Sequence, residues 1–174
     1  MTNPSEVGWR LVYCGLAGVA VSAYGAYVEY KKRTLQHNYT AMCDLSSYAS
    51  CSRVMTSAQG KMLSYYGVVP AGSMLDVSNA ALGVLAYGLF VMYPLVRSLP
   101  NFQYAYLFAA IISVVISAYL AYVLAFVLRD FCLVCVTSYV INAALLWNSI
   151  KLVRALPSKQ QAMSEAKKHA KKRQ

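Results

Sequence analysis

Residues 131–150 read FCLVCVTSYVINAALLWNSI, an uncharged and largely apolar run that contains a Cys-x-x-Cys pair near its start. Twenty residues form a helix of about 30 Å, which matches the hydrocarbon core of a bilayer. If this helix starts near Asp130, Cys132 and Cys135 lie one turn apart, within the range of a disulfide. Tyr139 follows one turn below Cys135 on the same face. The stretch therefore predicts a membrane helix with a redox dithiol at its mouth.

The composition of the whole chain indicates a membrane protein. Of its 174 residues, 59% are hydrophobic and 13% are charged, well below the roughly 25% charged residues of soluble proteins. Three further uncharged stretches are long enough to cross a bilayer, at residues 11–28, 77–96 and 98–128. Allowing for a turn at Pro100, we expect membrane spans at about residues 10–29, 78–97, 102–128 and 131–151.

This pattern predicts an all-α fold, an integral membrane four-helix bundle that forms one domain over residues 1–174. The segment 30–77, between the first and second spans, is too long for a simple turn, and we expect it to form a cap. In the first span, Gly15 and Gly18 offer a small-residue surface for close helix packing.

The distribution of charge predicts the orientation in the membrane. The formal net charge of +10 would suggest a nucleic-acid partner in a soluble protein, but eight of the sixteen basic residues follow residue 150. A basic tail beside a membrane span is typical of the cytosolic side and of contact with anionic lipid. We therefore expect the tail 152–174 and the N-terminus to be cytosolic, the segment 30–77 to be lumenal, and no nucleic-acid partner. The basic run 31–33 argues for the opposite orientation and is outweighed by the tail.

Cysteine spacing leaves several readings open. Cys43 and Cys51, eight residues apart, are expected on the same side of the membrane as Cys132 and Cys135, and four thiols allow three pairings. Structural disulfides would brace the cap, whereas a zinc site is disfavoured because the spacings are not those of usual zinc motifs. We predict no metal site. Cys14, within the first span, is most simply a buried inert thiol.

Two short signals bear on the compartment. Residues 38–40, Asn38-Tyr39-Thr40, fit the N-glycosylation acceptor pattern. The C-terminal sequence KKRQ places Lys171 and Lys172 four and three positions from the end, which resembles the cytosolic dilysine signal for retrieval to the endoplasmic reticulum. Both agree with a multi-pass protein of the endoplasmic reticulum membrane. The apolar stretch 62–70 is too short to span and should lie at the membrane interface or inside the cap.

The chain resembles the vitamin K epoxide reductase family. The resemblance rests on AMCDL at 41–45, SCSRV at 50–54, SN at 78–79, FCLVC at 131–135 and Tyr139, and it extends from about residue 11 to residue 151. It implies a four-helix membrane oxidoreductase of the endoplasmic reticulum that passes electrons from thiols to a quinone or its epoxide. The quinone would be a substrate, with no tightly bound cofactor.

The resemblance also implies roles for individual residues. Cys43 would receive electrons from a lumenal thioredoxin-like partner of the protein disulfide isomerase type, and Cys51 would relay them to Cys132 by thiol-disulfide exchange. Cys132 would face the lumen as the point of entry, and Cys135 would act on the quinone. The hydrogen-bond donors to the two quinone oxygens would be Asn79 and Tyr139.

The expected substrate pocket departs from the family pattern. Met55, Gln59 and Leu82 stand where vertebrate members carry an aromatic residue, a tryptophan and a phenylalanine, and Leu128 is the remaining expected lining residue. This thinner aromatic wall argues against the epoxide as preferred substrate and against strong binding of coumarin-type inhibitors. Two alternatives stay open: a quinone-dependent enzyme that forms disulfides in lumenal thioredoxin-like partners, and a disulfide-braced structural membrane protein.

Overall fold

The computed structural model describes residues 3–35, 40–44, 49–70, 72–73 and 75–156. The helical elements are α1 (Pro4–Leu35), α2 (Cys51–Thr56), the 3₁₀ turn η2 (Ala58–Gly60), α3 (Met62–Tyr65), α4 (Asn79–Val91), α5 (Tyr93–Val96), α6 (Phe102–Tyr122), the π-helical turn η3 (Val123–Leu128) and α7 (Leu133–Ala155). The described part of the chain is all-helical, as predicted. The predicted glycosylation site at Asn38 and the dilysine signal at Lys171 and Lys172 lie outside the described residues.

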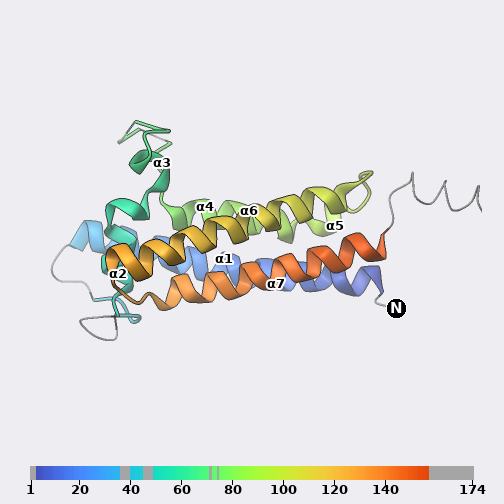
Figure 1. The fold of residues 1–174 in the computed structure, drawn as a ribbon, viewed down its shortest axis with the longest axis horizontal. Helices are drawn as coiled ribbons and strands as arrows, with labels where there is room; N and C mark the ends of the chain where they lie inside the picture. Colours follow the sequence, from blue (N-terminus) through green and yellow to red (C-terminus); the bar gives the residue numbers. More distant parts are fainter. Residues whose placement is uncertain (1–2, 36–39, 45–48, 71, 74, 157–174) are drawn as a thin grey trace, which may run out of the picture.

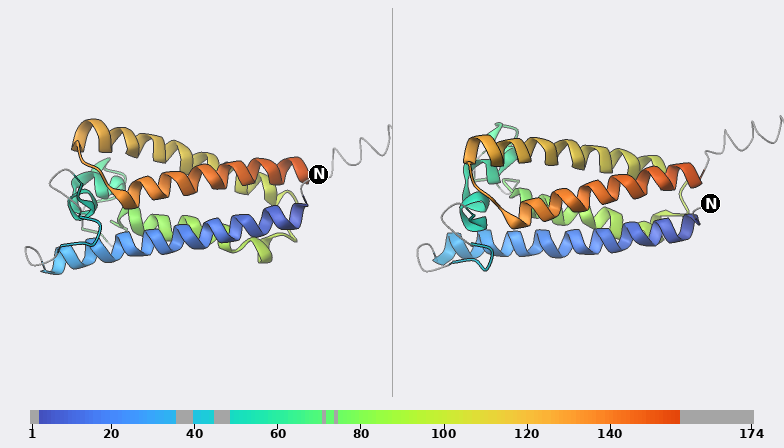
Figure 2. Two further views of the ribbon diagram at one scale, coloured as in Figure 1. Left: turned by 90° about the horizontal axis from the view of Figure 1, so that it is seen from below. Right: turned by 60° about the horizontal axis from the view of Figure 1, so that its bottom comes forward.

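The four longest helices run alongside one another. Helix α1 packs against both α4 and α7, and α6 packs against α7 (Figures 1 and 2). The short helices α2 and α3 lie at one end of the bundle, and the start of α1 and the end of α7 lie at the other (Figure 1). The segment between α1 and α4 therefore lies at the end where α7 begins, which places all four cysteines of interest together.

Three of these helices are long and apolar enough to cross a membrane, namely α1, the continuous stretch Phe102–Leu128, and α7. The expected second span, 78–97, forms two pieces instead of one helix. Helix α4 has 13 residues, which is about 20 Å, and the chain resumes as α5 after Met92. Pro94 explains the break, because it has no backbone N–H and its ring excludes the carbonyl four residues earlier.

Helix α7 begins later than the sequence suggested. The expected start near Asp130 is wrong, because α7 starts at Leu133 and Cys132 is its N-cap in an extended conformation. Arg129, with φ of 50°, ends the preceding helix in the left-handed conformation. The short connection back from α6 then uses residues 130–132 as extended chain. The Cys-x-x-Cys pair consequently spans the helix start, with Cys132 before the first turn and Cys135 within it.

The bundle contains two clusters of buried side chains. We call the first the aromatic cluster; it comprises Val7, Leu11, Val12, Tyr87, Phe90, Tyr93, Phe102, Tyr106, Ala110, Leu145 and Leu152. Its rings meet edge to face, with centroids 5.4 Å apart for Phe90 and Tyr106. Gly15 of α1 brings the helices close, because a Cβ there would lie 3.1 Å from the Cβ of Phe90. This surface agrees with the small-residue packing predicted for the first span.

The second cluster, which we call the cysteine cluster, lies at the other end of the bundle. It comprises Val28, Ala41, Cys43, Cys51, Leu124, Cys132 and Val134. Its members come from α1, from the segment before α4, from η3 and from the start of α7. It therefore joins the two cysteine pairs in one buried region.

Candidate active site

The first cysteine pair of the site is a disulfide. Cys43 and Cys51 are bonded to each other, with their Cα atoms 5.7 Å apart, and both are buried. The spacing left three pairings of the four thiols open. The structure contains the Cys43–Cys51 bond, whereas Cys132 and Cys135 are free thiols. Cys51 is the first residue of α2, and Ser50 before it caps that helix by accepting a hydrogen bond from the Arg53 amide.

Asp44 organises the chain around this disulfide. Its carboxylate accepts hydrogen bonds from the Ala41 amide (3.0 Å), the Ser50 hydroxyl (2.9 Å), and the amide (2.9 Å) and hydroxyl (2.6 Å) of Ser52. Burial acts to raise the pKa of Asp44, but the hydrogen bonds from Ser52, Ala41 and Ser50 outweigh it and lower that pKa below its ordinary value. The carboxylate thus stays ionised at neutral pH and fixes the conformation of both loop cysteines.

The second pair, Cys132 and Cys135, consists of free thiols in contact. Their sulfur atoms are 2.8 Å apart, and the Cys135 amide donates to the Cys132 sulfur at 3.3 Å. Both the Cys135 thiol and its amide therefore donate to the Cys132 sulfur. Hydrogen bonds of this kind favour the thiolate that thiol-disulfide exchange requires.

Cys132 was expected to face the lumen, but the structure buries it completely. Its exposed fraction is 0%, and Cys51 is equally buried within the same cluster. The physical reason is that the segment carrying α2 folds back over the start of α7. Asp130 fixes this arrangement, because its carboxylate pairs with the Arg53 guanidinium at 2.7 Å and accepts from the Ser50 amide at 3.3 Å.

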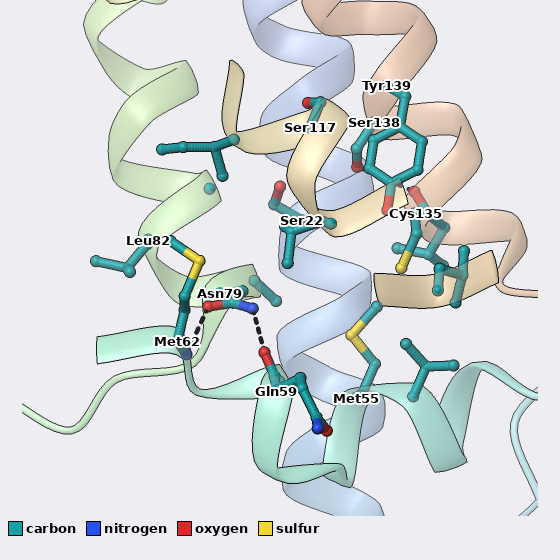
Figure 3. Close-up of a pocket in the computed structure, with 18 of the residues that line it drawn as sticks. Ser22, Met55, Gln59, Met62, Asn79, Leu82, Ser117, Cys135, Ser138 and Tyr139 are labelled. Carbon is teal, nitrogen blue, oxygen red and sulfur yellow. Dashed lines mark hydrogen bonds between the residues drawn. The ribbon is translucent and has the colours of Figure 1, made fainter. Parts of the chain in front are cut away.

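Cys135, in contrast, lines a cavity of about 210 Å³ between the helices. This volume is more than ten times the roughly 15 Å³ that a single water needs. The expected pocket residues, together with Gln59, all line this cavity: Met55, Asn79, Leu82, Leu128, Cys135 and Tyr139. Figure 3 shows the Cys135 sulfur and the Tyr139 ring on one wall, with Asn79 across the cavity. Cys43, Cys51 and Cys132 are not part of its lining.

Asn79 holds the cap against the cavity. It is the first residue of α4, and its side chain accepts from the Met62 amide at 3.0 Å and donates to the Gln59 carbonyl at 2.8 Å (Figure 3). An amide nitrogen carries two hydrogens, so one donor remains after the bond to Gln59. Asn79 can therefore position the cap and still donate one hydrogen bond to a ligand.

The sequence reasoning missed a polar region deeper in the cavity. Ser117 and Asn142 both line it, and the Asn142 amide donates to the Ser117 hydroxyl at 2.7 Å, joining α6 to α7. The Asn142 carbonyl oxygen is buried without a hydrogen-bond partner among the described residues. The signal in the sequence is that Asn142, seven residues after Cys135, shares a helix face with Cys135 and Tyr139; Ser117 comes from α6, and only the structure places it beside them.

Cys14 is partly buried and packs against the aromatic cluster, in a different part of the bundle from the other thiols. Within the described ranges, no group of three or more His, Cys, Asp or Glu side chains is arranged to hold a metal ion.

Comparison with known proteins gives a consistent result. Residues 9–150 match the family model described as "Vitamin K epoxide reductase family". The chain is 38% identical over 151 residues to "Vitamin K epoxide reductase complex subunit 1" of Mus musculus, covering 83% of this chain and 88% of the mouse protein. It is 37% identical over 148 residues to the Rattus norvegicus protein of the same name, with the same coverage.

Proposed function

Because the chain belongs to the vitamin K epoxide reductase family, we propose that this membrane oxidoreductase reduces vitamin K quinone, its epoxide, or both. The observation that carries the proposal is that Cys135 lines a cavity between the helices together with Asn79 and Tyr139, while its redox partner Cys132 belongs to the same buried cluster as the loop cysteines. One thiol of the dithiol can thus meet a substrate while the other meets an electron source. The quinone is proposed as a substrate that comes and goes, not as a bound cofactor.

The proposed relay begins at the loop. A lumenal thioredoxin-like dithiol reduces the Cys43–Cys51 disulfide and is itself oxidised to a disulfide. The Cys51 thiolate then attacks the Cys132 sulfur of an oxidised Cys132–Cys135 pair, which releases Cys135 as a thiolate. Cys43 attacks Cys51 next, re-forming the loop disulfide and releasing Cys132. Two electrons and two protons have then moved from the loop to the helix pair.

The proposed substrate step uses the reduced helix pair. Cys132 and Cys135 together give two electrons and two protons to the quinone, which becomes the hydroquinone as the disulfide between them forms. With the epoxide, the same two electrons and protons yield quinone and water. The free amide hydrogen of Asn79 and the hydroxyl of Tyr139 would donate to the two ring oxygens and stabilise the charge that develops there. Met55, Leu82 and Leu128 would pack on the ring.

The proposed setting is the membrane of the endoplasmic reticulum, with both termini cytosolic and residues 30–77 lumenal. In this arrangement α4 and α5 together form the second of four spans. The other three are α1, α6 with η3, and α7. The loop cysteines and the start of α7 would then lie on the lumenal side, where a protein disulfide isomerase-type donor could reach them. Glycosylation at Asn38 would report the orientation directly.

One experiment separates the candidate reactions. The purified protein in lipid nanodiscs is given dithiothreitol with either vitamin K quinone or vitamin K epoxide, and the products are separated by chromatography. We expect quinone reduction, since the aliphatic Met55 and Leu82 leave less to hold an epoxide in place. Absence of turnover with the epoxide alone would remove that substrate, and absence of turnover with both would contradict the proposed function.

A trapping experiment tests the relay and the structural alternative. In protein carrying both Cys43→Ala and Cys135→Ala, the mixed disulfide between Cys51 and Cys132 has no thiol to resolve it from the loop or from the helix. We expect this species to accumulate and to be found by mass spectrometry of unreduced peptides. Cys51 and Cys132 that never bond to each other would instead indicate a disulfide-braced structural protein.

A further inference from the structure

Asp130 connects the two redox segments of the molecule. It lies two residues before Cys132, and its side chain is 5% exposed. One carboxylate oxygen pairs with the Arg53 Nε at 2.7 Å, and the other accepts from the amides of Ser50 at 3.3 Å and Phe131 at 3.1 Å. We call Asp130, Arg53 and Ser50 the Asp130 clamp.

The clamp joins the residues on both sides of Cys51 to the segment that precedes Cys132. Ser50 and Arg53 flank Cys51, whereas Asp130 precedes Cys132, so the carboxylate ties together the segments that carry the two fully buried sulfurs. Thiol-disulfide exchange needs the attacking thiolate aligned with the disulfide, and a misplacement of about 1 Å can cost 100-fold in rate.

Resting on the proposed relay, we propose that Asp130 is a positioning residue for electron transfer, which holds Cys51 against Cys132 through its ion pair with Arg53. The clamp acts on the exchange between the two pairs and not on the quinone, because Asp130, Arg53 and Ser50 do not line the cavity. The Arg53 guanidinium also offsets part of the negative charge of Asp130, which would repel a thiolate at Cys132.

The neighbouring carboxylate Asp44 has a different task. Its partners are Ala41, Ser50 and Ser52, all within the loop segment, so it shapes the loop disulfide without reaching α7. A second ion pair of the cap, Lys61 with Asp76 at 2.8 Å, contacts neither cysteine segment. Lys61→Gln is therefore a matched control for loss of a cap ion pair.

The first test measures the proximity of the two sulfurs directly. In full-length protein carrying Cys14→Ala, Cys43→Ala and Cys135→Ala, only Cys51 and Cys132 remain of the five cysteines. The equilibrium between these thiols and their disulfide is then measured against mixtures of reduced and oxidised glutathione. This measurement gives the effective concentration of one thiol at the other and needs no quinone.

We expect Asp130→Asn to lower this effective concentration about 10- to 100-fold. In asparagine one of the two acceptor oxygens is replaced by an NH2 donor and the negative charge is lost, so the ion pair with Arg53 disappears and one of the two partners faces a donor. Lys61→Gln should leave the value unchanged, and the reversed pair Asp130→Arg with Arg53→Asp should restore part of it. An unchanged value in Asp130→Asn would overturn the proposal.

The second test separates positioning from general damage. In protein with all cysteines present, turnover is driven either by reduced thioredoxin, which enters at the loop, or by dithiothreitol, which can reach Cys135 through the cavity. Asp130→Asn should slow the thioredoxin-driven reaction at least tenfold and change the dithiothreitol-driven reaction by less than about twofold.

The outcomes of this second test are distinct. Equal loss with both donors would contradict a positioning role. A wild-type protein that reduces no quinone with either donor would contradict the proposed function, while the glutathione equilibrium would still decide whether the clamp holds Cys51 at Cys132.

Discussion

The two buried clusters of the bundle are built from different interactions. In the aromatic cluster, long helices meet through edge-to-face rings and aliphatic side chains, with Leu11, Leu145 and Leu152 fully buried. In the cysteine cluster, short helices and extended chain are held by carboxylates, a disulfide and helix caps. Packing of the first kind favours one permanent arrangement. The second kind brings both cysteine pairs into one buried region beside charged side chains, which is the arrangement that the proposed relay requires.

The largest expected difference in activity is between a variant of Cys135 and a variant of Cys14. Cys135→Ala should reduce dithiothreitol-driven quinone reduction to background, because the dithiol can no longer supply two electrons. Cys14→Ala should retain the activity, since that thiol packs beside the aromatic cluster. Product formation measured on equal amounts of folded protein checks both variants. Substantial turnover by Cys135→Ala would place the chemistry elsewhere.

Truncation in the aromatic cluster should act on stability instead. Phe90 is 1% exposed, and Phe90→Ala should lower the free energy of unfolding by about 3 kcal/mol through lost contacts and a cavity. Activity per folded molecule should persist, because Phe90 does not line the substrate cavity. Unfolding in detergent followed by fluorescence measures the effect, and Leu89→Ala, 58% exposed on the same helix, serves as control.

The cap should respond to acid in a way that the aromatic cluster does not. Hydrogen bonds from Lys61 and Gly72 lower the pKa of Asp76 to about 2, from an ordinary value of 3.8. A lowered carboxyl pKa means that its stabilisation is complete above the unfolded value and is lost as the pH falls from about 4 to about 2. Pepsin cleavage of the cap should therefore increase over this range, and Asp76→Asn should weaken that dependence.

The smallest expected effect on stability concerns the hydrogen bond between Asn142 of α7 and Ser117 of α6. Ser117→Ala removes the partner of the Asn142 amide and should cost about 0.6 kcal/mol, as for other hydrogen bonds between membrane helices. Ser113→Ala is the control, because that hydroxyl donates to the Ala109 carbonyl of its own helix. Thermal unfolding of both variants distinguishes them; equal stability would mean that Asn142 finds another partner.

Some features of the fold could be predicted from the sequence, and others could not. The uncharged runs predicted the long helices because helix length and hydropathy are local properties, and the family was identified from the cysteine motifs and confirmed by the comparisons. The start of α7 was wrong by three residues, because the reversal at Arg129 depends on how α6 and α7 connect. The second span, expected as one stretch over 78–97, is divided near Pro94 into α4 and α5.

The sequence by itself determined the all-helical class, the apolar runs and the one-turn spacing of Cys132 and Cys135. Each of these follows from residue type and period along the chain. Only the tertiary structure decided that Cys132 is buried in the same cluster as Cys51, that Asp130 ties their segments together, and that Cys135 alone of the four lines the cavity. Those relations depend on how Ser50 and α2 pack over the start of α7, and contacts between residues 80 positions apart leave no periodic signal in a single sequence.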